Sequence, residues 1–151
     1  MPVSIIFPIF RRYSTTIGLS NPGDYAVSES HESVLNEILD IHEAFSPINH
    51  IRKFTLIKGD ASEKIDEWLA ENPHAIISLA IFDMDVYKPT KEVLQKILPR
   101  LVRGSVLLFD ELNCPNFPGE TLALDEVLGL NNIRLQKSPL QPFSSWMQFE
   151  G

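Results

Sequence analysis

The chain has 151 residues, which is enough for one domain and too few for two. It carries 20 acidic and 13 basic residues, and the formal net charge of −7 argues against a nucleic-acid partner, because phosphate binding requires a basic surface. Cys114 is the single cysteine, so the sequence excludes an internal disulfide and a zinc site built on thiolates.

The first 30 residues are expected to form a segment that consists mostly of loops. The opening stretch MPVSIIFPIF is apolar, but its arginines follow it, which is the wrong order for a secretory signal. Residues 14–30 are rich in Ser, Thr, Gly and Asn and predict a loop. The longest apolar run, AIISLAIF, is far too short for a membrane span. We therefore expect a cytoplasmic protein with no membrane partner.

From residue 31 onward, helical and extended patterns alternate. Apolar residues recur at helical spacing over residues 31–45, and Pro47 follows them. Further along the chain, short apolar runs predict strands, and amphipathic stretches between them predict helices. The expected strands cover residues 54–60, 75–83 and 105–111, and the expected helices cover 61–72, 88–104 (closed by Gly104) and 119–130. The segments NIRLQKS and SWMQFE favour an antiparallel pair at the edge of the sheet.

This alternation predicts an α/β fold, a partial Rossmann-like, mostly parallel sheet with helices on both faces and an antiparallel C-terminal edge. Crossovers in such sheets are right-handed, so all parallel strands end at one edge, where ligands bind. Three expected strands end in an acid, namely Asp60, Asp83 and Asp110. We expect one edge of the sheet to collect all three carboxylates.

Two of these acids belong to pairs, because Asp85 follows Asp83 and Glu111 follows Asp110. Neighbouring strands lie about 4.8 Å apart, so Asp83 and Asp110 on adjacent strands could bind one Mg²⁺. Glu111 or Asp85 could add a ligand, and a site made only of oxygens favours Mg²⁺, Mn²⁺ or Ca²⁺ over zinc. The structural alternative is that each acid caps a helix or faces solvent.

Three chemistries use such a pattern. The DxD of FDMDVY resembles the opening motif of haloacid-dehalogenase phosphatases, with Asp83 as nucleophile, although few residues follow it for the partner motifs. VLLFDE resembles a Walker B strand, but the sequence has no GxxxxGK[ST] loop to hold a nucleotide. The third chemistry is metal-dependent methyl transfer. The acid pattern by itself leaves this choice open.

The segment from about residue 54 to 126 resembles the C-terminal half of class I S-adenosylmethionine-dependent methyltransferases, and most closely the macrocin O-methyltransferase group. The motifs that carry the resemblance are LIKGDASEKI, FDMDVYKPTKEVLQKILPRLVRGSVLLFDE and PGETLALDE. Members of this group methylate sugar hydroxyls of natural products. The resemblance therefore implies an O-methyltransferase that uses S-adenosylmethionine and a divalent cation and acts on a hydroxyl of a small molecule.

The resemblance also implies roles for individual residues. The metal ligands would be Asp83, Asp110 and Glu111, and the cofactor contacts would be Asp60, Ala61 and Asp85. In that scheme the cation holds two neighbouring substrate oxygens and lowers the pKa of one hydroxyl. No general base is identified. Glu120 and Thr121 open the last expected helix and are interpreted as its caps, in a loop that lies beside the metal in this group.

The sequence departs from the group at its N-terminal side. It lacks the glycine-rich cofactor loop that follows the first strand, and the first two strand–helix units are missing. The strands expected over 54–60 and 75–83 would then either pair directly or receive a substitute strand, from VSIIF near the start or from a second chain, and the exposed apolar edges would recruit a partner. We expect one truncated domain over residues 1–151, with an α/β core over 31–151, as a homodimer or with a partner chain. The alternatives are a non-catalytic remnant or interaction module, and a metal-dependent phosphatase.

Overall fold

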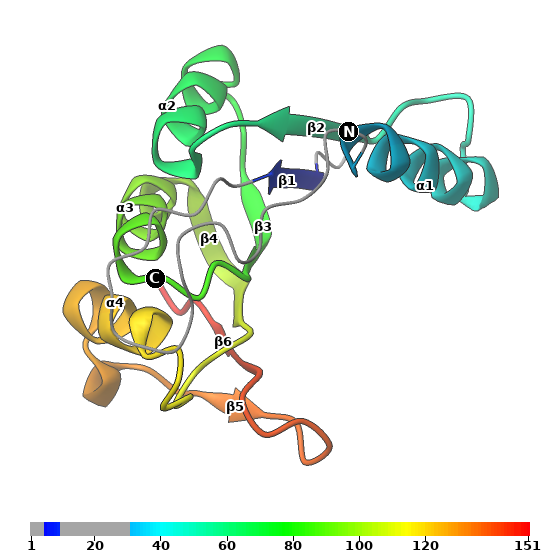
Figure 1. Cartoon of the computed structure of the whole chain (residues 1–151). Helices are drawn as coiled ribbons and strands as arrows, with labels where there is room; N and C mark the ends of the chain where they lie inside the picture. The colour runs from blue at the N-terminus through cyan, green and yellow to red at the C-terminus, as the bar shows by residue number, and fades with distance from the viewer. Residues whose placement is uncertain (1–4, 10–30) are drawn as a thin grey trace.

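The computed structural model describes residues 5–9 and 31–151 (Figure 1). In chain order its elements are β1 (Ile5–Ile9), α1 (His31–Phe45), β2 (Phe54–Lys58), α2 (Ala61–Glu71), β3 (Ile77–Phe82), α3 (Tyr87–Ile97), the 3₁₀ turn η1 (Leu98–Arg100), β4 (Leu101–Phe109), α4 (Gly119–Leu128), η2 (Leu130–Asn132), β5 (Gln136–Lys137) and β6 (Ser145–Gln148). The loop expected over residues 14–30 lies outside the described residues. Within the described ranges, no helix has the length and apolar character needed to cross a bilayer.

The strands form two separate sheets. One contains β1 and β2 in parallel, and the other has the order β3-β4-β6-β5. In the second sheet β3 and β4 are parallel, whereas β6 runs antiparallel to both of its neighbours. The α/β fold with flanking helices and an antiparallel C-terminal edge is therefore confirmed. The strand near the start forms as β1, but it pairs with β2 and not with β3.

The prediction that one sheet edge collects all three strand-terminal acids is wrong for Asp60. Asp60 follows β2, which belongs to the β1–β2 sheet, whereas Asp83 and Asp110 follow β3 and β4 of the larger sheet. The acids after β3 and β4 therefore form one group, and Asp60 lies apart from it in the sheet topology.

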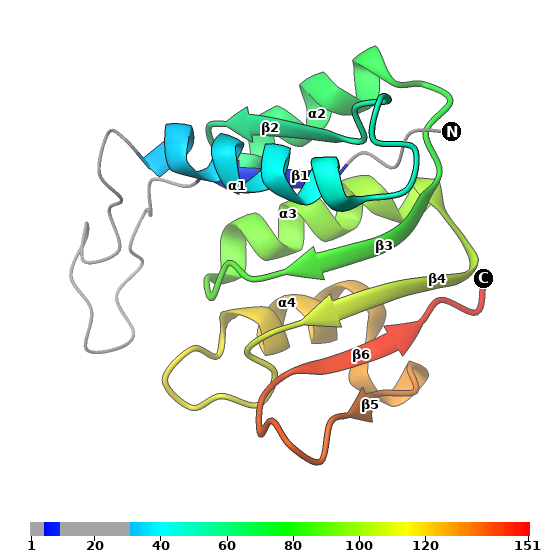
Figure 2. The ribbon, with the colours of Figure 1, turned by 90° about the vertical axis from the view of Figure 1, so that its right-hand side faces the viewer.

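The main core lies between the larger sheet and the helices α3 and α4, which cover one of its faces (Figure 2). Side chains on a strand alternate between the two faces, and those that face the helices are almost fully buried. The buried apolar cluster comprises Phe82, Leu94, Ile97, Leu101, Leu107, Phe109, Leu112, Leu124 and Met147. At the ends of β3 and β4 the rings of Phe82 and Phe109 stack at 4.8 Å between centroids, in the range of favourable aromatic pairs.

Among residues 5–9 and 31–151, no helix covers the opposite face of this sheet over β3, so the prediction of helices on both faces does not hold there. Leu79 and Ile81 point away from the α3–α4 layer and remain 54% and 63% exposed. The apolar character of β3 on both sides predicted burial on both sides, and the described residues supply cover for only one of them.

The boundary between α3 and β4 also differs from the sequence prediction. The helix ends at Ile97 and η1 follows, and β4 already begins at Leu101, where a helix was expected up to Gly104. Pro99 has no amide hydrogen to donate, so the α-helix does not continue through it. Gly104 lies inside the strand with φ of 94°, a backbone conformation that glycine adopts without strain, and its amide donates to the carbonyl of Phe149.

The smaller sheet is tied to the rest of the described chain through α2. Lys96 on α3 donates to the carbonyl oxygen of Ser62 at 2.6 Å and to the carboxylate of Asp66 at 2.7 Å. Helix α1, in contrast, contains no buried residue. Polar bonds from α3 thus connect α2 to the larger sheet, whereas α1 contributes no buried side chain to the fold.

Candidate acidic site at the ends of β3 and β4

The acids that follow β3 and β4 lie side by side, as the parallel topology predicts. Phe82 and Phe109 are partners in the strand register, and the amide of Asp110 donates to the carbonyl oxygen of Phe82 at 3.0 Å. Asp83 and Asp110 therefore follow directly on paired positions of adjacent strands. We call Asp83, Asp85, Asp110 and Glu111 the acidic rim.

Asp110 is held by the loop that precedes β6. Its Oδ1 accepts a hydrogen bond from the hydroxyl of Ser144 at 2.7 Å. The position of Ser144 is set in turn by Gln141, whose Oε1 accepts the amides of Phe143 and Ser144, both at 2.6 Å. Ser144 therefore orients the carboxylate of Asp110 at the end of β4.

Beneath the rim lies Glu120, whose side chain is fully buried at 0% exposure. Its Oε1 accepts the backbone amides of Met84 and Asp85, at 3.2 and 3.4 Å. Its Oε2 accepts the amide of Glu111 at 3.0 Å. A single carboxylate thus joins the loop after β3 to the loop after β4.

Burial raises the pKa of Glu120 to about 7, because the charged form loses its hydration inside the protein. The amides of Glu111, Met84 and Asp85 act in the opposite direction and stabilise the charge, while the nearby carboxylate of Asp85 again disfavours it. Loss of hydration is the largest of these effects. Glu120 therefore has its charge change near neutral pH, among the backbone groups that shape the rim.

The sequence interpretation of Glu120 and Thr121 as caps of the last helix is wrong. Helix α4 has no side-chain cap bond at its start; Glu120 accepts from the two rim loops, and Thr121 Oγ1 accepts the amide of Asn113 at 2.8 Å. The sequence offered no sign of this role, since an acid in the first turn of a helix is explained equally well by capping.

Gly119 allows α4 to approach the rim closely enough for these bonds. A Cβ atom at this position would lie 2.4 Å from the amide nitrogen of Tyr87 and 2.7 Å from the carbonyl oxygen of Asp85. Both are backbone atoms, which cannot move aside without shifting a loop. Asp85 itself has φ of 57°, in the left-handed region, so the loop after β3 turns sharply at the point of contact.

The loop after β4 folds back beneath the rim as a compact turn. The amide of Cys114 donates to the carbonyl oxygen of Glu111 at 3.4 Å, and its own carbonyl accepts the amide of Phe117 at 3.2 Å. The thiol-bearing residue is only 5% exposed. This turn leads the chain from β4 to α4 and so fixes Glu111 and Glu120 relative to each other.

The three proposed metal ligands do not assemble into a complete centre. Over residues 5–9 and 31–151, no group of three His, Cys, Asp or Glu side chains is close enough to hold a metal ion. Glu111 nevertheless has a carboxylate oxygen, Oε2, that is buried without a hydrogen-bond partner. Such an oxygen is costly unless a donor or a cation satisfies it. The donor chemistry of the rim fits a hard cation, but no three of its carboxylates are close enough to hold one in the described arrangement.

Asp60 and Ala61, the other sequence-predicted cofactor contacts, lie at the end of β2. Asp60 is the N-cap of α2, and its Oδ1 accepts the amide of Ser62 at 2.8 Å. Ala61 is buried in the first turn of that helix. Asp60 therefore has the capping role that the sequence offered as the alternative to ligand binding, and it caps the helix through Oδ1.

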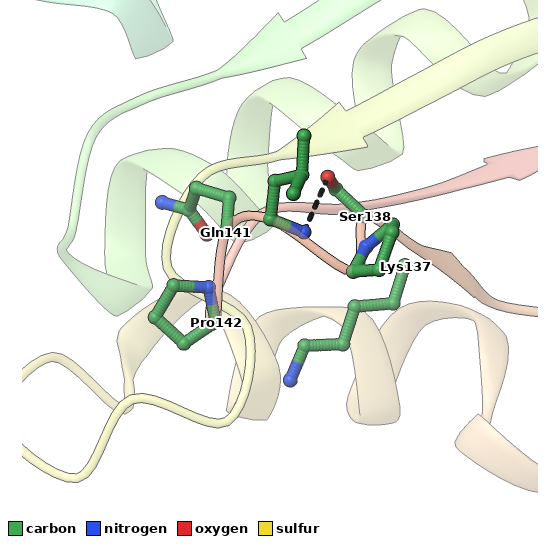
Figure 3. Close-up of a pocket in the computed structure, with 6 residues that line it drawn as sticks. Lys137, Ser138, Gln141 and Pro142 are labelled. Carbon is green, nitrogen blue, oxygen red and sulfur yellow. Dashed lines mark hydrogen bonds between the residues drawn. The ribbon is translucent and has the colours of Figure 1, made fainter.

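The larger of two hollows in the described part of the chain lies in the loop between β5 and β6. It has a volume of about 450 Å³ and is lined by residues 137–142 (Figure 3). Within it the amide of Leu140 donates to the hydroxyl of Ser138 at 3.2 Å. Because Gln141 both lines this hollow and holds Ser144, the hollow is connected to Asp110 through hydrogen bonds.

Comparison with solved structures shows a clear likeness to one methyltransferase. The chain matches the crystal structure of CalS11, calicheamicin methyltransferase, with 41% identity and a TM-score of 0.80, over 84% of this chain and 50% of that one. It matches the apo structure of CalS11, described as a TDP-rhamnose 3'-O-methyltransferase of calicheamicin biosynthesis, with 40% identity and a TM-score of 0.78, over 83% and 55%.

A more distant likeness supports the fold alone. The O-methyltransferase NovP matches with 14% identity and a TM-score of 0.56, over 89% of this chain and 57% of that one. No protein-family model and no curated protein sequence matches the chain. The chain spans about half the length of the CalS11 structures that it matches.

Proposed function

We propose that this chain takes part in methyl transfer to a hydroxyl group of a small molecule. Over the part that it shares with CalS11, it belongs to the S-adenosylmethionine-dependent methyltransferases. The observation that carries this proposal is the 41% identity over 84% of the chain. CalS11 is described as acting on TDP-rhamnose, so a sugar hydroxyl on a nucleotide is the first substrate class to test.

Within the acidic rim, we assign Asp83, Asp110 and Glu111 to substrate and cation. Asp83 and Asp110 follow adjacent strands, and the unpartnered Oε2 of Glu111 supports a cation of the Mg²⁺ class at these three residues. When bound, such a cation lowers the pKa of a substrate hydroxyl. Completing the site requires a rotation of Glu111 or further oxygen ligands from water or substrate.

The cofactor side is assigned to Asp60, Ala61 and Asp85. The second carboxylate oxygen of Asp60 and the sharply turned backbone at Asp85 are the features that support contact with S-adenosylmethionine. Asp85 is in a left-handed conformation, and its amide donates to the carboxylate of Glu120. The residues of this chain would thus orient the cofactor and the acceptor without themselves forming a covalent intermediate.

The test is a methyl-transfer assay with labelled S-adenosylmethionine and TDP-rhamnose, together with manganese titration followed by electron paramagnetic resonance. We expect Asp110→Asn to weaken manganese binding by about tenfold or more, because a neutral amide replaces a charged ligand. Asp40→Asn is the matched control, since Asp40 lies on α1 and pairs at the surface with Arg52. Equal manganese binding by the two variants would contradict the assignment of the rim.

A second candidate is a non-catalytic interaction module with the same fold. It is supported by the half-length match and by the open face over β3. The two candidates are separated by calorimetric titration with S-adenosylmethionine. Measurable binding of the cofactor supports the enzyme, and absence of both cofactor binding and methyl transfer supports the module.

A further inference from the structure

The hollow in the loop between β5 and β6 lies at the same edge of the sheet as the acidic rim. Strand β6 runs antiparallel to β4, and Ser145 at its start pairs with Phe109 at the end of β4. The residues that precede Ser145 therefore lie beside Asp110, and Ser144 contacts it directly. Ligands of open α/β sheets bind at this edge. The volume of about 450 Å³ is in the range of sites for small molecules.

The polar side chains that line this hollow offer hydrogen-bond donors (Figure 3). Oε1 of Gln141 already accepts two backbone amides, so its Nε2 group faces the other way and offers two N–H donors. The hydroxyl of Ser138 accepts the amide of Leu140 and keeps its own hydrogen for donation. Lys137 adds an ammonium group, and among the described residues no carboxylate side chain lines the hollow. Such a lining suits a ligand that carries acceptors and a negative charge.

Lys137 differs from the other lysines of the chain in its lack of an ionic partner. Each of the others forms an ion pair with a carboxylate, namely Lys53, Lys58, Lys64, Lys88, Lys91 and Lys96. Over residues 5–9 and 31–151, Lys137 forms none, although the net charge of the chain is −7. A net negative charge repels an anion at long range, so binding at the hollow depends on direct contact with this ammonium group.

The loop around the hollow is shaped before any ligand binds. Pro139 and Pro142 fix the backbone angle φ at two of its positions. The hydrogen bonds accepted by Ser138 and Gln141 close a turn on either side of Leu140. A preformed site loses little conformational entropy on binding. The two prolines and Leu140 also give the hollow apolar walls, which suit the C–H faces of a sugar ring.

We propose that this hollow is the subsite for the phosphate of a phosphorylated sugar acceptor, with Lys137 as its ionic partner and Ser138 and Gln141 as hydrogen-bond donors. The inference rests on the proposed methyl transfer at the acidic rim and names the part of the acceptor that is held beside it. Gln141 lines the hollow and binds the backbone of Ser144, which in turn contacts Asp110, so the hollow and the rim belong to one site. A sugar anchored by its phosphate here lies next to the rim.

The experiment is calorimetric titration of the 151-residue chain with TDP-rhamnose in the presence of a chelator, so that no cation at the rim contributes to phosphate binding. We expect Lys137→Ala to weaken binding by about tenfold or more, because a charge-assisted contact is lost. Titration with TDP, which has the phosphates without the sugar, is expected to show the same loss. Lys137→Arg keeps the positive charge and is expected to retain most of the affinity.

Arg134→Ala is the matched control. Arg134 is also exposed and lies three residues before Lys137, but it does not line the hollow, and its removal changes the net charge by the same amount. Circular dichroism is expected to show the wild-type fold in every variant, because both side chains are exposed. Unchanged affinity in Lys137→Ala, an equal loss in Arg134→Ala, or no binding of TDP-rhamnose by the wild-type chain overturns the proposal.

A methyl-transfer assay with the same variants separates this inference from the proposed function. A raised KM for TDP-rhamnose in Lys137→Ala supports both. Methyl transfer with an unchanged KM in this variant overturns the phosphate subsite and leaves the proposed function in place. Binding of TDP-rhamnose that depends on Lys137, without any methyl transfer, supports the subsite and contradicts the proposed function.

Discussion

At the scale of single residues, the geometry of the rim depends most on Glu120. It carries no visible ligand function, yet its two oxygens accept the amides of both loops that bear the acids. A buried carboxylate in this position is costly by desolvation and is stabilised by its three backbone donors. Glu120 therefore positions the rim from below, and its protonation links the stability of the fold to pH.

The raised pKa gives this link a definite sign. Glu120 binds its proton more tightly in the folded state, with a pKa of about 7 against the ordinary value of 4.5. The folded state therefore gains stability from this proton below about pH 4.5, and loses it as the pH rises through about 7. We expect this loss to be on the order of 3 kcal/mol in the free energy of unfolding.

The measurement is urea denaturation at about pH 5 and about pH 8 in the presence of a chelator, on the wild-type chain and on Glu120→Gln. An amide cannot titrate, so the pH-dependent loss attributed to Glu120 is expected to be absent from the variant. Carboxylates that do not interact with Glu120 contribute equally to both proteins and cancel in the difference. If the two proteins lose the same amount of stability, the raised pKa of Glu120 is refuted.

At the scale of elements, α4 packs so closely against the loop after β3 that a methyl group added at Gly119 would clash with the backbone of that loop. Gly119→Ala places a Cβ within 2.7 Å of backbone atoms of the Asp85–Tyr87 segment. Because backbone cannot give way as a side chain does, we expect a destabilisation of about 1–3 kcal/mol, together with weaker bonds to Glu120.

Chemical denaturation of Gly119→Ala checks this prediction. Leu122→Ala in the same helix is the control, because the side chain is exposed and the change is expected to stay within about 0.5 kcal/mol. Equal stability of the two variants would show that α4 can move away from the loop at little cost.

Much of the element order was predictable from the sequence. The helix over 31–45 and the strand beginning at residue 54 follow from periodicity and were predicted at their observed positions. The boundary after Ile97 was not, because Pro99 bends or ends a helix and the local pattern does not decide which; pairing of Leu101 with Ile77 decides it. Tertiary contacts override local preference at such points.

The site was predictable in part. Adjacency of Asp83 and Asp110 follows from two parallel strands and was predicted correctly. The grouping of Asp60 with them required knowledge of which strands pair, and the sequence has no signal for the separation of β2 from β3. The role of Glu120 depends on contacts across 36 residues in the chain, which periodicity does not report.

At the scale of the whole molecule, the described chain consists of one well-packed part and one weakly held part. The larger sheet with α3 and α4 contains the buried apolar cluster. Helix α1 buries no residue, and Phe45 at its end is 88% exposed. Little apolar burial therefore stabilises α1 against local unfolding.

Native-state hydrogen exchange should reveal this difference. We expect the amides of α1 to exchange through openings that require about half the global unfolding free energy or less. Those of α3, where Leu94 and Ile97 are buried, should exchange only on global unfolding. Uniform protection across both helices would show that α1 is stabilised as strongly as the core.

The buried turn at Cys114 has a practical consequence for observing the site. Since the chain has no other cysteine, a thiol reagent modifies a single atom, and that atom lies in the segment that joins Glu111 to Glu120. Alkylation requires this segment to open, because the thiol is shielded from the reagent in the folded state. The rate of labelling at Cys114 therefore reports how often the acid-bearing loop opens. A compound that binds to this loop would slow the labelling, and the measurement does not require knowledge of which reaction the protein performs.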